Sequence, residues 1–259
     1  MQIDYLNCNL NKHIFKKNDE VLIKEELKLY NLSLNDESNY NDYNNDKEKQ
    51  YYGLEKWKKS YNYHDKHPHH KFLIDNINEL IKTIFLNKRV DILDFGCGPG
   101  CLSKWIYYDN IKNNINLHCI DNYNDHIQQT IFNFQKETKI IFPFIDVSAN
   151  IIKGSIHELD IVNKYDIIFT CTVLMHIPFI SAIGILKKLA SLSKGYIIHI
   201  ENLSGCVVKG KTKSNLQNLS IDYIKIYKLL GFTAITNNII FDPHVSKAKY
   251  GYYIFKKNN

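Results

Sequence analysis

The sequence predicts a doubly wound α/β fold, with helices on both faces of a parallel sheet and an antiparallel pair of strands at its end. Between residues 90 and 200, short apolar runs alternate with helical patterns, as expected for strands buried on both faces. A glycine-rich turn at 96–100 joins the first run to a helix. The last two β-type runs are joined by residues 242–249 alone, which is too short a link for a helical crossover.

The composition fits one large α/β domain with a full core. The chain has 259 residues, 44% of them hydrophobic, and a net charge of +6. The lysines are spread out, which favours a solvated surface, although a basic excess is also compatible with nucleic acid. The six cysteines form no CxxC pair, so we expect reduced thiols in a cytoplasmic compartment. The N-terminus lacks the apolar core of a signal peptide.

The N-terminal quarter differs from the rest of the chain. Residues 35–50 are polar and almost free of aliphatic side chains, as in a surface loop or flexible linker. Residues 51–70 are dense in aromatics and histidines. From Pro68 to Phe85, apolar residues recur every three or four positions, which predicts a helix that starts at the proline. We therefore divide the chain into an N-terminal extension, 1–67, and a main domain, 68–259.

The main domain then reads as strands and helices in alternation. Predicted strands lie at Val90–Phe95, at Leu117–Ile120 before Asp121, at Ile167–Thr172 and at Tyr196–Ile200. Predicted helices lie at Gly100–Tyr108, Asn124–Phe134 and Phe179–Leu192. The third strand is either Ile140–Ile145 or a run within Asn150–Ile156. A helix at Ile221–Leu230, stopped by Gly231, leads to the final strands Phe232–Phe241 and Tyr250–Lys256.

The uncharged run Ile167–Leu186 is long enough to raise the question of a membrane span. It contains Pro178 and several polar residues, and it divides naturally into strand, loop and helix. We therefore expect no association with a membrane.

The turn ILDFGCGPG, residues 92–100, carries the first chemical signal. A dinucleotide turn needs G-x-G-x-x-G, but here the spacing is G-x-G-x-G and position 101 is cysteine. Asp94 stands two residues before the first glycine, where a dinucleotide fold usually keeps an apolar residue. An acid there suggests a ligand with a positive group and no pyrophosphate. S-adenosylmethionine (SAM) has both an ammonium and a sulfonium group.

This segment resembles the first motif of class I SAM-dependent methyltransferases, and the order of elements extends the resemblance over about residues 68–256. The resemblance implies a Rossmann-like seven-stranded sheet, with SAM as cofactor and S-adenosylhomocysteine (SAH) as product. It implies that the motif holds the methionine part of SAM through Asp94, Gly96, Cys97, Gly98 and Gly100. It also implies that Asp121, beside Asn122, holds the ribose hydroxyls, because a carboxylate accepts both hydroxyl protons.

A third family position, after the third strand, contacts adenine. One alignment offers Ser155 and Ile156, and the other offers Asp146. We favour Ser155 and Ile156, because they leave the more typical gap to the fourth strand.

The segment YDIIFTCTVLMHIP resembles the family's fourth motif, which implies that residues 172–178 line the pocket between cofactor and acceptor. We expect Thr172 to contact the cofactor and Met175 the substrate. His176 is a candidate general base, or it only shapes the pocket. Glu201 is a second candidate, or a structural carboxylate. Methyl transfer from a sulfonium needs mainly alignment and desolvation, so a base is not required.

The aromatic N-terminal segment, with Tyr52, Trp57, Tyr61 and Tyr63, forms either a lid over the pocket or ordinary packing. The histidines at 64, 67, 69 and 70 invite a metal interpretation, but Pro68 interrupts any single helical face that could present them together. We expect surface histidines and no metal.

The sequence therefore predicts an enzyme that transfers a methyl group to an oxygen or nitrogen of a small molecule. RNA methylation is the alternative, suggested by the net charge and by Lys209, Lys211 and Lys213. A non-catalytic SAM-binding subunit and, more remotely, an NAD oxidoreductase are the others. The oligomeric state is not predicted.

Overall fold

The structure is a computed structural model of the chain. It describes residues 68–110, 112–141, 150–154, 164–177, 179–202, 206–207, 218–219, 221–242 and 248–258. The N-terminal extension, with its proposed lid residues, lies outside this part of the chain.

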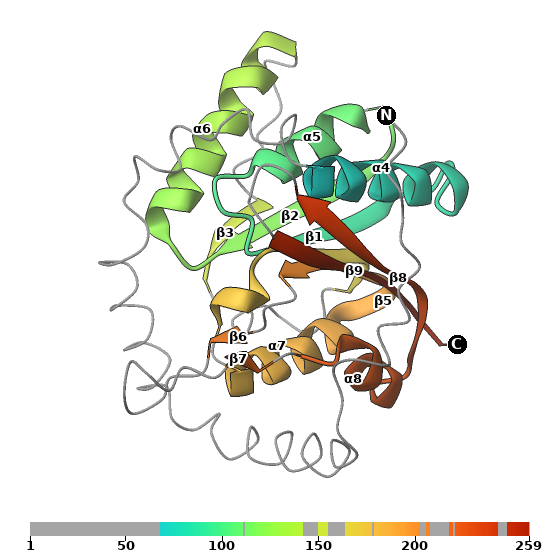
Figure 1. Cartoon of the computed structure of the whole chain (residues 1–259). Helices are drawn as coiled ribbons and strands as arrows, with labels where there is room; N and C mark the ends of the chain where they lie inside the picture. Colours follow the sequence, from blue (N-terminus) through green and yellow to red (C-terminus); the bar gives the residue numbers. More distant parts are fainter. Residues whose placement is uncertain are drawn as a thin grey trace.

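Seven strands form one sheet in the order β3-β2-β1-β4-β5-β9-β8 (Figure 1). Neighbouring strands from β3 to β5 are parallel, whereas β9 runs antiparallel to both β5 and β8. The bounds are β1 Val90–Phe95, β2 Ile115–Asp121, β3 Ile151–Lys153, β4 Tyr165–Cys171, β5 Ser193–Asn202, β8 Phe232–Asp242 and β9 Ala248–Lys257. The predicted fold, including the antiparallel final pair, is confirmed.

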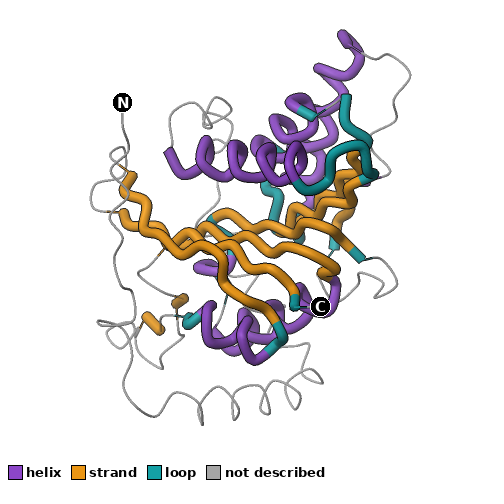
Figure 2. The backbone as a smooth tube through the Cα atoms, turned by 90° about the vertical axis from the view of Figure 1, so that its right-hand side faces the viewer, coloured by secondary structure: helices purple, strands orange, loops and turns teal. Residues whose placement is uncertain are grey.

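Helices cover both faces of the sheet, as Figure 2 shows from the side. Three lie on one face: α4 Pro68–Thr83, α5 Cys101–Asp109 and α6 Asn124–Ile141. Two lie on the other: α7 Phe179–Leu192 and α8 Tyr223–Leu229. A short 3₁₀ helix, η4 Leu174–His176, follows β4. Within the described residues, no helix is both long and apolar enough to cross a membrane.

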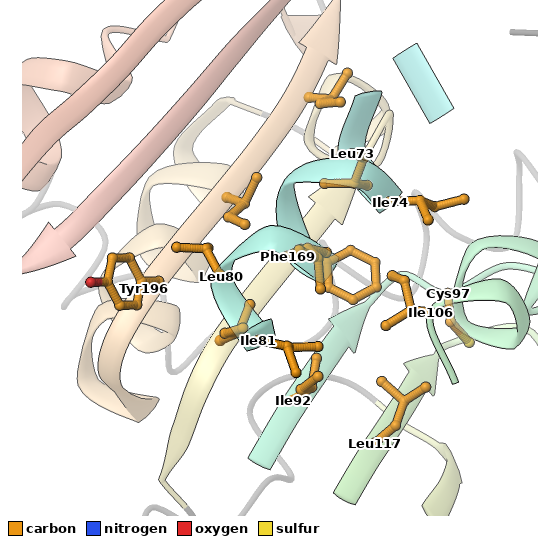
Figure 3. Packing of buried hydrophobic residues seen from close by; sticks show 14 of the residues in the cluster. Leu73, Ile74, Leu80, Ile81, Ile92, Cys97, Ile106, Leu117, Phe169 and Tyr196 are labelled. Carbon is orange, nitrogen blue, oxygen red and sulfur yellow. The ribbon is translucent and has the colours of Figure 1, made fainter. Parts of the chain in front are cut away.

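Each face of the sheet has its own hydrophobic core. On the α4 side, Ile92 of β1 and Phe169 of β4 pack with Leu73 and Ile81 of α4 (Figure 3). On the other side, neighbouring residues of the same strands pack with α7 and α8. Successive side chains of a strand point to opposite faces. This two-sided burial explains why these strands read as continuous apolar runs.

The third strand decides between the two sequence alternatives. Helix α6 continues past Phe134 to Ile141, so the candidate strand at 140–145 is wrong. The true strand, Ile151–Lys153, lies within the second candidate and pairs with the end of β2. The sequence analysis also missed a two-stranded ribbon formed by β6, Cys206–Val207, and β7, Asn218–Leu219.

Candidate active site

The glycine turn lies between β1 and α5, at the carboxyl ends of the parallel strands. Gly96, Gly98 and Gly100 have φ angles of 74°, 55° and 74°, a region that favours glycine. A Cβ on Gly96 would lie 2.5 Å from both methyl carbons of Val173, and one on Gly100 would lie 2.6 Å from Cγ2 of Thr130. At Gly98 a Cβ would meet no described atom within 4 Å. Gly96 and Gly100 therefore permit close packing, whereas the backbone at Gly98 is open to a ligand.

Asp121, at the end of β2, is tied to this turn. Its Oδ2 accepts a hydrogen bond from the Gly98 N–H at 2.9 Å. Its Oδ1 accepts one from the Tyr123 N–H at 2.9 Å and lies 3.2 Å from Nδ1 of His126. A carboxylate offers about four lone-pair sites, so one is left for a further donor. The carboxylate thus joins the glycine turn to the start of α6.

Asp94 lies below the turn and is only 3% exposed. Burial raises the pKa of Asp94 to about 7. The Ser103 hydroxyl of α5 donates a hydrogen bond to Oδ2 and opposes the rise in pKa, while the charge of Asp121 adds to it. A buried acid of this kind is stabilised in its ionised form when a cation comes near.

The loop after β4 packs directly on the glycine turn, through the Val173–Gly96 contact. It begins at Thr172, whose φ of 57° is uncommon for a residue other than glycine. The Thr172 N–H donates to the Ile200 carbonyl of β5 at 2.7 Å. Backbone strain of this kind clusters at functional sites.

Glu201, near the end of β5, anchors this loop. Its Oε1 accepts hydrogen bonds from the Thr170 hydroxyl at 2.8 Å and the Val173 N–H at 3.2 Å. Its Oε2 accepts one from the Met175 N–H at 3.3 Å. Burial raises the pKa of Glu201 to about 7, against the opposing effect of these hydrogen bonds. With three hydrogen bonds to loop and strand, the carboxylate fixes the backbone of η4.

A buried hydrogen-bond chain, missed in the sequence analysis, extends from Glu201. Thr170 Oγ1 lies 2.7 Å from Nδ1 of His199, and Nε2 of His199 lies 2.7 Å from the Tyr227 hydroxyl of α8. Burial lowers the pKa of His199 to about 3, so the ring is neutral. Because Thr170 donates to Glu201, Nδ1 of His199 carries the proton and Nε2 accepts from Tyr227. The sequence signal for this buried chain was the strand IIHIE, in which the polar residues His199 and Glu201 stand two positions apart.

The other predicted residues are placed as follows. Cys97 is buried beneath the turn, with its sulfur 4.0 Å from the Thr130 hydroxyl, and Asn122 is half-buried beside Asp121. His176 ends η4, but its side chain lies outside the described part of the structure. Ser155, Ile156 and Asp146 also lie outside it, as do Lys209, Lys211 and Lys213.

The histidines at the start of α4 differ from the prediction. His69 is 3% exposed and stacks on Tyr250 of β9 with ring centroids 4.3 Å apart. The expectation of a surface side chain is therefore wrong for His69. His64 and His67 lie outside the described residues.

Comparison with known proteins identifies the family. A family model described as a methyltransferase domain matches residues 64–230. A magnesium protoporphyrin IX methyltransferase from Synechocystis PCC 6803, solved with bound SAM, has a TM-score of 0.53 and 17% identity. The alignment covers 73% of this chain and 80% of that one. A SAM-dependent methyltransferase from Clostridium acetobutylicum ATCC 824 has a TM-score of 0.52 and 13% identity, covering 73% and 92%. No curated protein sequence matches.

The residues at the site suit the cofactor of this family. The turn leaves open space at Gly98, Asp121 keeps one acceptor site beside it, and Asp94 is a buried acid next to the turn. The structural likenesses support the class I fold, and the family match covers most of the main domain. The chain therefore belongs to the methyltransferase-domain family and is a SAM-dependent methyltransferase with the class I fold.

Proposed function

We propose that the enzyme transfers the methyl group of SAM to an oxygen or nitrogen of a small-molecule acceptor. The charge pattern at the carboxyl ends of the strands carries this proposal. The described segments 96–100, 121–126 and 172–177 contain no lysine or arginine, while Asp121 and Glu201 supply carboxylates. The one lysine that ends a described parallel strand is Lys153, on the edge strand β3. An RNA substrate would need cations for its phosphates. This rim instead favours an acceptor without phosphates.

The residues that hold the cofactor follow from the site. SAM, when bound, supplies an electrophilic methyl group on a sulfonium. We assign the open backbone at Gly98 to its methionine part, Asp121 to its ribose and the Asp94 carboxylate to its positive charge. The Asp94 side chain is almost wholly enclosed. We therefore expect its carboxylate to act on the positive charge of SAM by electrostatic attraction rather than by direct contact. The position of β3 favours Ser155 and Ile156 over Asp146 for adenine, because they follow the strand by two and three residues.

The two candidate catalytic residues take different roles. The three hydrogen bonds of Glu201 support a positioning role, in which it holds the loop that lines the acceptor pocket. His176, at the end of that loop, is then our candidate general base for a hydroxyl or ammonium acceptor. Met175 and Thr172 belong to the same loop, and we assign them to the acceptor and the cofactor. Alignment and exclusion of water supply the rest of the rate.

Profiling of methyl acceptors tests this function. The full chain with isotopically labelled SAM is incubated separately with small metabolites and with RNA, both from cell extract. We expect label in the metabolite fraction. Label confined to RNA, together with retention on heparin that salt abolishes, would replace the proposal with RNA methylation.

Free thiols agree with the expected cytoplasmic location, which is part of this proposal. Four of the cysteines in the described part of the chain, Cys97, Cys101, Cys119 and Cys171, are free. Disulfides are rare in reducing compartments.

SAM binding is expected to depend on pH through Asp94. Its pKa of about 7 in the free protein means that the cation must bind an acid that is mostly protonated at pH 6. Binding at pH 6 therefore releases about one proton, and affinity should rise up to about tenfold towards pH 7.5. The folding stability of the free protein depends on pH with the opposite sign. Because the pKa of Asp94 is raised in the folded protein, the free energy of unfolding falls as pH rises from about 4 to about 7.

Calorimetry in two buffers with different ionisation enthalpies measures the released proton. Asp94→Asn should bind more weakly at pH 7.5 and lose the pH dependence. Glu201→Gln is the control. The pKa of Glu201 is also about 7, but its carboxylate contacts the loop after β4, so this variant should keep the pH dependence of SAM binding. An unchanged pH dependence in Asp94→Asn would show that another group titrates.

A further inference from the structure

Three metal-ligating side chains from distant parts of the sequence meet beside the cofactor turn. His69 and His70 lie in the first turn of α4, and Cys171 is the last residue of β4. One donor atom from each, an imidazole nitrogen or the thiol sulfur, lies within 4.8 Å of the other two. The histidines suggested a metal interpretation in the sequence, but Cys171 could not be connected with them, since about 100 residues separate it from His70.

The surroundings fix the histidines in this position. His69 is stacked on Tyr250, and the ring of His70 meets that of His69 edge-on at 4.2 Å. The neighbouring Lys71 is turned to solvent, where its Nζ bonds Asp75 at 2.6 Å. The ammonium group of Lys71 therefore does not compete with a metal ion for the site. His70 and Cys171 are half-buried, whereas His69 is buried.

We propose that His69, His70 and Cys171 bind one zinc ion. Imidazole nitrogen and thiolate sulfur are the ligands that zinc prefers. In a tetrahedral zinc site such donors lie about 3.5 Å apart, given bond lengths of about 2.0–2.3 Å. The donor atoms are now up to 4.8 Å apart. Shifts of about 1 Å, which side-chain rotations can supply, would bring them to the separation of a zinc site. A single ion then accepts a lone pair from all three groups at once.

Burial and, after it, the negative charges of Glu201 and Asp94 raise the pKa of the Cys171 thiol. A zinc ion bound to the sulfur would offset both effects, because a thiol that coordinates zinc is deprotonated. Three protein ligands leave the fourth zinc position for water or another small ligand. Cys171 stands two residues before Val173, whose side chain packs on Gly96. The zinc site thus adjoins the cofactor turn on the α4 side of the sheet.

Cobalt titration of the full chain, after treatment with a chelator, tests the site. Co²⁺ is a spectroscopic probe for tetrahedral zinc sites with thiolate ligands. We expect one Co²⁺ per chain, with a sulfur-to-cobalt charge-transfer band and strong visible absorption, both lost when Zn²⁺ displaces it. Binding of one equivalent without the charge-transfer band would overturn the proposal, as would no binding.

Matched variants locate the site. Cys171→Ser should lose the charge-transfer band and bind Zn²⁺ at least about tenfold more weakly. Cys101→Ser, the same change at a half-buried thiol outside the cluster, should keep both. His70→Gln tests the histidine side and serves alone if circular dichroism shows that Cys171→Ser is unfolded. Wild-type zinc affinity in a folded Cys171→Ser or His70→Gln would overturn the assignment.

Discussion

Replacing Asp121 with alanine is expected to weaken SAH binding by about 10- to 100-fold, because a hydrogen bond to a charged group contributes about 1.5–3 kcal/mol. The substitution removes the proposed partner of the ribose hydroxyls. It also deprives the Gly98 and Tyr123 N–H groups of their acceptor, so the turn loses its link to α6. Isothermal titration calorimetry with SAH measures the loss.

Two further variants separate the causes of that loss. Asp121→Asn keeps the shape but places an amide NH₂ against either the Gly98 or the Tyr123 N–H, so we expect weakened binding here as well. Asp125→Ala removes an exposed acid from the first turn of α6 and should bind SAH normally. A dissociation constant within twofold of wild type for Asp121→Ala would contradict the ribose assignment.

Elements whose own residues determine them could be predicted from the sequence. Strand β1 matches its prediction residue for residue, because its apolar side chains are buried on both faces of the sheet and form a nearly continuous run. The glycine turn could be recognised because its positive φ angles favour glycine at positions 96, 98 and 100. Boundaries fared worse. Helix α6 continues through Gln135 and the polar residues after it, which are good helix formers, and ends in apolar residues that resemble a strand.

Contacts between distant segments could not be predicted. Thr170 faces His199 only because β4 and β5 pair in that register, and no local pattern specifies a register. The burial of His69 depends on Tyr250, which lies on β9 near the other end of the chain. Read alone, a histidine after Pro68 is simply a polar residue at a helix start. The candidate site is therefore half local, in the turn and its acids, and half long-range, in the network that holds the β4 loop.

The second large expected effect is at Glu201, which anchors the loop after β4. Glu201→Ala leaves the Val173 and Met175 N–H groups and the Thr170 hydroxyl without their acceptor. Each buried group left in this way costs about 1–3 kcal/mol. We expect the loop at 172–177 to open, with hydrogen exchange of the Val173 and Met175 amides accelerated at least about tenfold. Mass spectrometry of the peptide that spans the loop measures this directly.

Asp166, a carboxylate at the opposite end of β4, provides the control for general destabilisation. It accepts a hydrogen bond from the Asp91 N–H at 2.8 Å and pairs with Lys194. Asp166→Ala should lower the free energy of unfolding without speeding exchange at Val173 and Met175 in particular. Glu201→Gln retains one oxygen, which can still accept from the Thr170 hydroxyl and the Val173 N–H, so it should restore protection at Val173 more than at Met175. If Glu201→Ala slows methyl transfer to the profiled acceptor while SAH affinity stays within a few-fold, the carboxylate acts by positioning the acceptor side of the pocket. Wild-type exchange at both amides would instead mean that the loop is held by its packing on Gly96 alone.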